Sequence, residues 1–160
     1  MGPALITLVL GGARSGKSEL AEQLAGPRAV YVATGVATNE DMADRIAAHR
    51  RRRPAGWSTV ETLDLAGALR TTPTDVVLID SLGTWLARHN DFAVDAAALV
   101  AALAAHRAHA IVVSEEVGMG VHPETAVGRC FRDALGTLNR AIAEVADEVL
   151  LVVAGRSLRL

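Results

Sequence analysis

The chain has little of several residue types, and each shortage excludes a class of protein. Among its 160 residues there is one cysteine, Cys130, so no disulfide forms within the chain and no cysteine-ligated zinc site is expected. Five side chains are aromatic (two Trp, two Phe and one Tyr), so the core must be aliphatic. A formal net charge of −2 provides no whole-molecule attraction for nucleic acid, and small-molecule substrates suit this composition better.

Long hydrophobic runs are also missing. The apolar stretch at residues 93–105 is mostly alanine, contains Asp95 and falls short of the ~20 residues that a membrane helix needs. The stretch at residues 4–10 has no basic segment before it, which favours a strand over a signal peptide. We therefore expect no membrane span. A single free thiol suits a reducing interior, so we expect a cytoplasmic protein with one domain over residues 1–160.

Lysine is almost absent, and the position of the one lysine is informative. Of the 16 Lys and Arg side chains, only Lys17 is a lysine, and it lies in GGARSGKS, a full match to the phosphate-loop pattern G-x-x-x-x-G-K-[ST]. Its compact ammonium can reach the β- and γ-phosphates of a nucleotide, where the wide guanidinium of arginine would not fit. The predicted phosphate-binding residues are Gly11, Gly12, Ala13, Arg14, Ser15, Gly16, Lys17 and Ser18.

The residues on either side of this loop support the assignment. Residues 4–10 are apolar and partly β-branched, which predicts a strand, and residues 18–25 place Leu20 and Leu24 at helical spacing. Backbone N–H groups and the positive end of that helix would bind phosphate oxygens, and the Ser18 hydroxyl would bind Mg²⁺. The alternative is a glycine-rich turn without a ligand, and the order of strand, loop and helix argues against it.

Apolar runs typical of strands alternate with segments typical of helices along the whole chain. Strands are predicted at residues 4–10, 28–34, 57–62, 75–80 and 109–114, with the last strand at 148–153. Helices are predicted at residues 18–25, 41–52 (with Met42 and Ile46 facing inward), 63–69, 81–89, 95–108 and 125–146, and glycines and a proline make 115–123 a loop. Together with the phosphate loop, this alternation predicts an α/β protein of the P-loop NTPase (RecA-like) type. Its sheet is doubly wound and mostly parallel, with helices on both faces and the ligand at the carboxyl edge of the strands.

The strand predicted at residues 75–80 ends in a carboxylate. In P-loop proteins an aspartate at the end of a buried strand holds Mg²⁺, directly or through water, so Asp80 and Ser18 are candidate magnesium ligands. Two alternatives remain open. Asp80 is also placed to cap the helix that follows it, and Glu115 and Glu116 come after another strand whose end lies at the same edge.

His49 is followed by four arginines, Arg50 to Arg53, close to the predicted end of a helix. Cations there complement the helix dipole, so a solvated helix end accounts for the arginines. A histidine beside arginines is favoured in its neutral form, which leaves a nucleophilic nitrogen next to groups that can bind a triphosphate. From the residues alone, His49 is either a surface side chain or a nucleophile.

Several motifs taken together resemble one known family. They are the phosphate loop, YVAT at 31–34, MADRI at 42–46 with His49 and Arg53-Pro54, EEVGMG at 115–120 with Pro123, FRD at 131–133, Gly136, Asn139 and ADEV at 146–149. In this order they closely resemble the bifunctional adenosylcobinamide kinase/adenosylcobinamide-phosphate guanylyltransferase family over nearly the whole chain. The combination of GGARSGKS with EVGMG is far more specific than a phosphate loop alone.

The resemblance implies two reactions in the nucleotide-loop assembly of cobalamin. A kinase step phosphorylates the aminopropanol hydroxyl of adenosylcobinamide with ATP or GTP. A second step moves GMP from GTP, through a guanylyl-histidine, onto that phosphate and yields adenosylcobinamide-GDP and pyrophosphate. By its spacing from Arg45-Ile46 and Arg53-Pro54, the family's guanylylated histidine falls on His49, which joins Lys17 as a catalytic residue.

The resemblance also implies nucleotide contacts, both in the phosphate loop after Gly11 and in later segments of the chain. They fall at Gly12 to Ser18, Ala33, Thr34, Gly35, Arg50, Arg51, Arg52, Arg53, Glu61 and Asp80. Glu61 would accept a hydrogen bond from a guanine N–H edge or from a ribose hydroxyl, and the sequence does not choose between them.

The chain departs from the family in a few places. Asp80 stands where Glu is frequent, which shortens the reach of the carboxylate by one methylene, and Arg140 stands where Gln is frequent. The ending at residues 154–157 differs as well, which bears on C-terminal packing and on the homotrimer that the resemblance implies. Two other functions remain open: a small-molecule P-loop kinase without nucleotidyl transfer, and a nucleotide-binding regulatory module.

Overall fold

The structure is a computed structural model that describes residues 5–36 and 40–160, except for the side chain of Arg45. Ala4, placed by the sequence at the start of the first strand, lies outside the described residues, as does Asn39. The strands are β1 (Leu5–Gly11), β2 (Val30–Ala33), β3 (Ser58–Glu61), β4 (Val76–Asp80), β5 (His109–Glu115), β6 (Glu148–Val153) and β7 (Arg156–Arg159).

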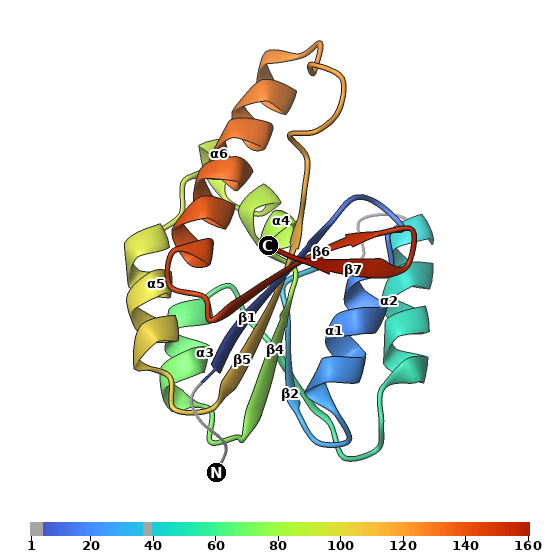
Figure 1. The fold of residues 1–160 in the computed structure, drawn as a ribbon, viewed down its shortest axis with the longest axis vertical. Helices are drawn as coiled ribbons and strands as arrows, with labels where there is room; N and C mark the ends of the chain where they lie inside the picture. The colour runs from blue at the N-terminus through green and yellow to red at the C-terminus, as the bar shows by residue number, and fades with distance from the viewer. Residues whose placement is uncertain (1–4, 37–39) are drawn as a thin grey trace.

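The helices are α1 (Lys17–Ala25), α2 (Glu40–Arg52), α3 (Leu65–Thr71), α4 (Leu82–Ala87), α5 (Ala96–Ala105) and α6 (Ala126–Ala143), with a 3₁₀ turn, η1 (Asn90–Phe92), after α4. They cover both faces of the sheet: α1 and α2 lie on one side, and α3, α4, α5 and α6 lie on the other (Figure 1). Among the described residues, no helix is both long and apolar enough to cross a bilayer.

The strands form one sheet in the order β3-β2-β4-β5-β1-β6-β7. All neighbouring pairs are parallel except β6 with β7. The phosphate-loop strand β1 and the Asp80 strand β4 are therefore not neighbours, because β5 is inserted between them. The predicted doubly wound, mostly parallel α/β fold is confirmed.

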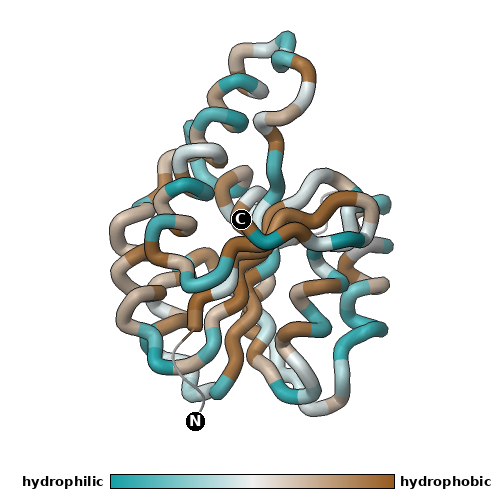
Figure 2. The backbone as a smooth tube through the Cα atoms, viewed as in Figure 1, coloured by the Kyte–Doolittle hydropathy of each residue, from teal (hydrophilic) through white to brown (hydrophobic). Residues whose placement is uncertain are grey.

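Two apolar cores lie on the two faces of the sheet. Along β1, Leu8 and Leu10 pack into the core under α3 to α6, whereas Val9 between them packs into the core under α1. The same strand is thus buried on both faces, as its continuous apolar run predicts. Figure 2 shows the hydrophobic strands running through the centre of the molecule.

Helix α1 packs through its smallest side chains. Of the two leucines at helical spacing, Leu20 packs partly buried against the core and Leu24 is 38% exposed, whereas Ala21 and Ala25 are buried. Small residues let the helix lie close to the sheet beneath it. This close approach turns Glu22, the next residue after Ala21, toward the neighbouring helix α2.

Strand β7 was not predicted from the sequence. Residues 148–153 were predicted as the last strand, which is wrong, because Arg156–Arg159 returns antiparallel to β6. The turn between them needs two residues with positive φ, Ala154 (51°) and Gly155 (74°). With charged residues at both ends, β7 lacks the apolar alternation by which a strand is recognised.

A half-buried histidine lies at the edge of the sheet opposite the phosphate loop. His109 begins β5, and its Nε2 is 2.9 Å from the hydroxyl of Thr7 on β1. Burial lowers the pKa of His109, and the carboxylate of Glu148 opposes this shift only in part. The folded protein therefore keeps the neutral ring down to a lower pH than the unfolded chain does.

This shift predicts a loss of stability in acid. Below about pH 6.5, the ordinary pKa of histidine, the unfolded chain takes up a proton that the folded His109 refuses, so the free energy of unfolding falls as pH decreases. Urea denaturation at pH 7.5 and 5.5 measures the difference. His109→Gln is expected to reduce the decrease, and the exposed His122→Gln is the control; equal decreases in the wild type and His109→Gln would contradict the argument.

Candidate active site

The phosphate loop connects β1 to α1 at the carboxyl edge of the sheet. Its backbone enters the left-handed region at Arg14 (φ 57°) and Gly16 (φ 95°). A Cβ on Gly16 would lie 3.3 Å from the Cα of Gly155, and the N–H of Gly155 donates to the carbonyl of Ser15 at 2.8 Å. The β6–β7 turn therefore braces the loop from outside, and only glycine suits position 16.

Two groups of the loop are prepared for an anion. The Lys17 Nζ donates to the carbonyl of Gly12 at 3.2 Å, which folds the ammonium back over the loop. The hydroxyl of Ser15 is buried and has no hydrogen-bond partner among the described residues. A buried hydroxyl without a partner is costly, and a phosphate oxygen would satisfy it.

Asp80 stands at the end of β4 and receives hydrogen bonds from the hydroxyls of Ser18 and Tyr31, the latter at 3.2 Å. Burial raises the pKa of Asp80, and the nearby negative charge of Glu115 raises it further. His49 and the two hydroxyls act in the opposite direction. Burial, reinforced by Asp80, raises the pKa of Tyr31, so its hydroxyl keeps its proton and donates. The predicted magnesium pair, Ser18 and Asp80, is thus brought together.

The alternative carboxylates have other partners. Glu115 accepts from the Ser81 hydroxyl at 2.8 Å and from the Gly83 N–H at 2.9 Å, so both of its oxygens are engaged at the start of α4. Glu116 accepts from N–H groups of its own loop, including that of Met119 at 3.2 Å. Ser81, not Asp80, caps α4. Of the three carboxylates, Asp80 is the one beside Ser18.

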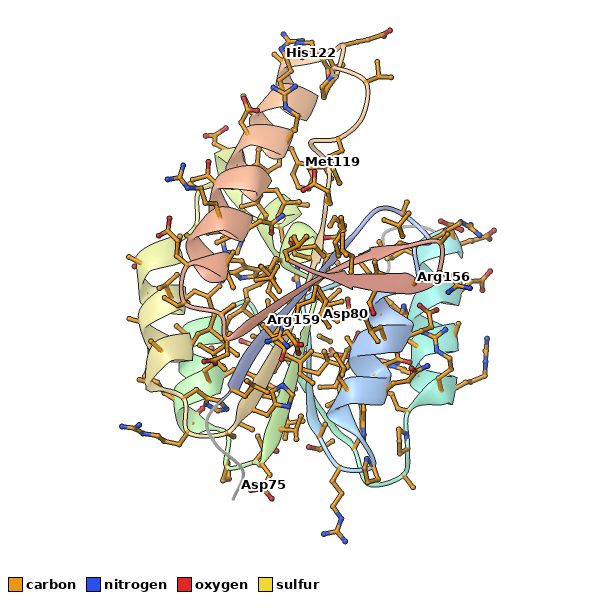
Figure 3. The ribbon with its side chains drawn as sticks, in the orientation of Figure 1. Asp75, Asp80, Met119, His122, Arg156 and Arg159 are labelled. Atoms are coloured by element: carbon orange, nitrogen blue, oxygen red, sulfur yellow. The ribbon has the colours of Figure 1, made fainter. Side chains whose placement is uncertain are left out.

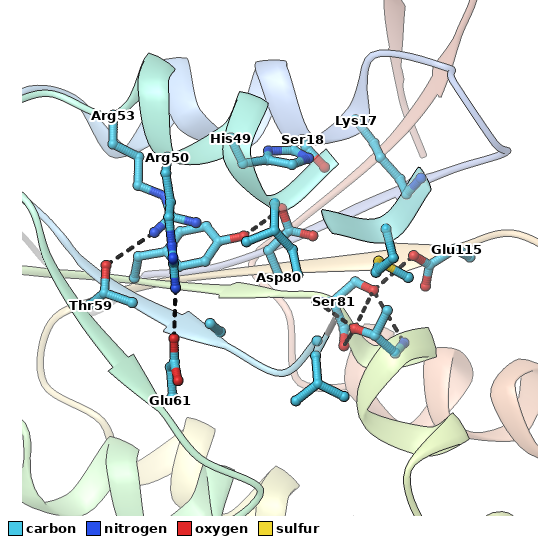
Figure 4. A pocket seen from close by; sticks show the side chains of 17 residues that line it. Lys17, Ser18, His49, Arg50, Arg53, Thr59, Glu61, Asp80, Ser81 and Glu115 are labelled. Carbon is cyan, nitrogen blue, oxygen red and sulfur yellow. Dashed lines mark hydrogen bonds and ion pairs between the residues drawn. The ribbon is translucent and has the colours of Figure 1, made fainter. Parts of the chain in front are cut away.

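Half of the predicted site residues line one cavity of about 350 Å³ between the sheet edge and α2 (Figure 4). A volume of this size is typical of a small-molecule site. The predicted residues that line it are Lys17, Ser18, Ala33, Gly35, His49, Arg50, Arg53, Glu61 and Asp80. Met42 and Ile46, which the sequence placed on the inward face of α2, line this cavity as well.

A second cavity of about 620 Å³ lies on the outer side of the phosphate loop. The predicted residues that line it are Arg14, Ser15, Gly16, Lys17, Ser18, His49, Arg51 and Arg52. Lys17, Ser18 and His49 line both cavities. The histidine therefore stands between the phosphate loop and the cavity that contains Asp80.

The consecutive arginines point to different partners. Arg50 donates to Glu61 at 2.9 Å, which places a cation beside that carboxylate in the cavity. Arg53 lies with its guanidinium carbon 3.4 Å from the centre of the Tyr31 ring and donates to Thr59 at 3.0 Å. Its Nε is buried and has no partner among the described residues. A cation held flat on an aromatic ring is available to an anion in the cavity.

Arg52 turns away from the first cavity. Its Nε donates to Glu22 Oε2 at 3.1 Å, and its Nη1 lies 3.3 Å from Glu19 Oε1, so it joins α2 to α1. Thr34 also differs from its neighbours, because its side chain is fully buried and donates to the carbonyl of Ser81 at 2.8 Å. Thr34 is not among the residues that line either cavity.

Three residues at the site were not identified as functional from the sequence. Tyr31 supports Arg53 and donates to Asp80, Thr59 accepts from Arg53, and Glu22 lies 2.9 Å from the Nδ1 of His49. Tyr31 is the chain's single tyrosine, and this rarity is the one sequence feature that could have drawn attention to it. No sequence feature identifies Glu22, since an acidic residue on a helix is ordinarily exposed to solvent.

These features define an α/β protein of the P-loop nucleotide-binding class. A KaiC-like protein from Pyrococcus horikoshii OT3 superposes with a TM-score of 0.55 at 14% identity, over 94% of this chain and 73% of that one. The flagellar accessory protein FlaH from Methanocaldococcus jannaschii gives a TM-score of 0.51 at 15% identity, over 98% and 76%. At such identities the likeness shows the fold alone.

Sequence relatives define the family within this class. The family model for cobinamide kinase / cobinamide phosphate guanyltransferase matches residues 7–160. The bifunctional adenosylcobalamin biosynthesis protein CobU of Salmonella typhimurium is 38% identical over 94% of this chain and 97% of its own length, and CobP of Pseudomonas aeruginosa is 41% identical over 92% of each. The chain belongs to the cobinamide kinase / cobinamide phosphate guanyltransferase family, and the resemblance inferred from its motifs is confirmed.

Replacement of the single lysine is expected to weaken nucleotide binding. Lys17→Ala removes a charge-assisted hydrogen bond worth about 1.5–3 kcal/mol, so the affinity for GTP is expected to fall about 10- to 100-fold in titration calorimetry. Arg28→Ala, which removes an exposed cation just before β2 at the opposite sheet edge, is the control. Unchanged affinity in Lys17→Ala would refute the phosphate-loop assignment.

Proposed function

We propose that both activities of the family, phosphorylation of adenosylcobinamide and transfer of GMP to the resulting phosphate, take place at this sheet edge and that the guanylyl group passes through His49. The observation that carries the proposal is the position of His49, which lines the cavity over the phosphate loop and the cavity that contains Asp80. The products are adenosylcobinamide-GDP and pyrophosphate. Such an enzyme of intermediary metabolism, with ATP and GTP as substrates, belongs in the cytoplasm.

In the kinase step the phosphate loop holds the triphosphate. Its backbone N–H groups and Lys17 would bind the β- and γ-phosphates, and the unpartnered Ser15 hydroxyl would donate to a phosphate oxygen. The hydroxyl oxygen of the aminopropanol group attacks the γ-phosphorus, the bond from that phosphorus to the bridging oxygen breaks, and the nucleoside diphosphate leaves while the hydroxyl proton passes to solvent. The protein contributes position and positive charge to this reaction.

Magnesium is the ion that the Ser18 and Asp80 pair fits. Their side chains hydrogen-bond to each other, and a hydroxyl and a carboxylate are oxygen ligands of the kind Mg²⁺ takes together with phosphate oxygens and water. In the described part of the chain there is no group of three or more Asp, Glu, His or Cys side chains that could hold a metal ion by itself. This agrees with an ion held partly by the substrate. Bound Mg²⁺ would neutralise phosphate charge.

In the transfer step His49 acts as the nucleophile. Its Nε2 attacks the α-phosphorus of GTP, the bond to the bridging oxygen breaks, and pyrophosphate leaves; the acceptor phosphate then displaces the histidine from the phosphorus. Arg50 and Arg53, which line the same cavity, would stabilise the negative charge on the α-phosphate. Glu61, whose Oε1 is held by Arg50, is left with a second oxygen for a guanine N–H or a ribose hydroxyl.

Labelled GTP tests this route. After incubation with GTP labelled at the α-position, the wild-type protein is expected to retain an acid-labile GMP adduct, and GTP labelled at the γ-position is expected to leave no label on the protein. His49→Ala is expected to lose the adduct and to keep most of the phosphate transfer to cobinamide. The exposed His122→Ala is the control. An adduct that survives in His49→Ala would refute the nucleophile, and a wild-type protein that phosphorylates cobinamide without any adduct would leave a kinase alone.

A homotrimer is the assembly that we propose. Its support is a set of exposed apolar side chains on two regions, the edge formed by β6 and β7 and the arm that projects from the sheet at the start of α6 (Figure 3). They are Val153, Leu158 and Leu160 at the edge, and Met119, Val121 and Val127 on the arm. Such side chains suit burial between subunits.

Sedimentation equilibrium measures the assembly directly. The expected mass is about 50 kDa, three times the 16.7 kDa of one chain, because three copies would bury both apolar regions. Leu158→Asp tests the edge and Val121→Asp tests the arm. Each is expected to lower the measured mass, because a buried charge would weaken the contact between subunits. A wild-type mass of one chain at micromolar concentration would contradict the trimer.

A further inference from the structure

We propose that Glu22 is a positioning residue for His49: its carboxylate holds the imidazole in the tautomer that leaves Nε2 free to attack phosphorus. The proposal rests on the guanylyl transfer proposed above and adds a residue to it. Glu22 lies in α1, directly behind the phosphate loop, and His49 lies in the last turn of α2. The Nδ1 of His49 and the Oε1 of Glu22 are 2.9 Å apart.

The charge on Glu22 decides which ring nitrogen carries the hydrogen. Burial acts to raise the pKa of Glu22, but the hydrogen bonds from His49 and Arg52 and the positive charge of Arg52 oppose it, and the pKa lies below its ordinary value. The carboxylate is therefore ionised at neutral pH and only accepts hydrogen bonds. A ring nitrogen 2.9 Å from such an oxygen must donate, so Nδ1 carries a hydrogen. In the neutral ring, which is the form that attacks phosphorus, Nε2 then carries the lone pair.

Arg52 keeps the carboxylate in this state. It donates to Glu22 through Nε, at 3.1 Å from Oε2, and through Nη2, at 3.2 Å from Oε1. The same Nη2 lies 3.0 Å from the Nδ1 of His49. A guanidinium nitrogen only donates, so a hydrogen bond between these two atoms would need a lone pair on Nδ1, which exists only in the tautomer with the hydrogen on Nε2. Arg52 and His49 therefore share the carboxylate of Glu22.

This arrangement suits both halves of the transfer. When Nε2 bonds to the α-phosphorus and pyrophosphate leaves with the electron pair of the broken P–O bond, the ring of His49 becomes positively charged. Nδ1 keeps its proton throughout, and the carboxylate of Glu22 faces the new charge. In the second half the electron pair of the P–N bond returns to Nε2, so the ring needs no proton from solvent. A carboxylate behind the histidine of a hydrolase triad has the same two effects, orientation and charge stabilisation.

A purely structural role for Glu22 predicts different behaviour. If the carboxylate only joined α1 to α2 through Arg52, its loss would loosen the helices without changing the hydrogen on His49. Glu19 provides the comparison, because it lies one turn earlier on α1 and pairs with Arg52 at 3.3 Å, while His49 pairs with Glu22. Glu19→Gln and Glu22→Gln each remove one negative charge next to Arg52. Only the second removes the acceptor of Nδ1.

The experiment compares these two variants with the full-length wild type. In Glu22→Gln the amide oxygen is expected to face Arg52 and the amide N–H₂ to face Nδ1, which moves the ring hydrogen to Nε2. The rate of adduct formation from α-labelled GTP is expected to fall about 10²- to 10⁴-fold, as when a triad carboxylate becomes an amide, with little change in the KM for GTP. Glu19→Gln is expected to stay within about twofold of the wild type.

Nitrogen NMR with ¹⁵N-histidine reads the tautomer directly, and a His49→Asn spectrum assigns the signals. At neutral pH the wild type is expected to show a protonated Nδ1 and an unprotonated Nε2 at His49, and Glu22→Gln the reverse. A wild-type ring protonated only at Nε2 overturns the proposal without any variant. An unchanged rate of adduct formation in Glu22→Gln overturns it as well. A slower rate with an unchanged tautomer also overturns it, because Glu22 would then only connect α1 to α2.

The same measurements separate this proposal from the transfer on which it rests. If the wild type forms no adduct, guanylyl transfer through His49 fails, and the positioning role fails with it. If the wild type forms the adduct at His49 and Glu22→Gln forms it equally fast, only the role of Glu22 fails.

Discussion

Parallel pairing of the central strands is the constraint on which the rest of this molecule depends. β1 pairs with β5 so that Gly11 lies beside Glu115, and β2 pairs with β4 so that Ala33 lies beside Asp80. Because parallel strands run in one direction, the loop after β1 and the carboxylate at the end of β4 reach the same edge although β5 separates them. Apolar side chains buried on both faces hold this register, since a shift by one residue would exchange the two faces of a strand.

Charge, rather than apolar packing, positions the helix that covers this edge. No described side chain of α2 is fully buried, and Met42 and Ile46 line the cavity instead of filling a core. The polar contacts of α2 run from His49 and Arg52 to α1 and from Arg50 to β3. The same ion pairs that hold the helix therefore set the orientation of its histidine, so position and chemistry have one physical origin.

Much of the fold follows from local patterns, and the errors occur where tertiary contact overrides them. The buried strands were recognisable as continuous apolar runs, and the phosphate loop was recognisable by its glycines and Lys17. β7 was not, because its backbone is held by β6 and by the turn at Gly155, which bonds to the phosphate loop. In α1 the spacing of Leu20 and Leu24 indicated a helix, but only the close approach of helix and sheet decided that Ala21 and Ala25 are its buried residues.

The sequence by itself determined the kind of chemistry: a phosphate loop with a single lysine, a carboxylate at a strand end, a histidine before four arginines, and a set of motifs that belongs to one family. Only the tertiary structure decided how these groups divide the work. It set Arg50 beside Glu61 and Arg53 on Tyr31, turned Arg52 to Glu22 and buried Thr34. Glu22 and His49 lie 27 residues apart. Their contact depends on how two helices pack, and no local pattern in the chain encodes that distance.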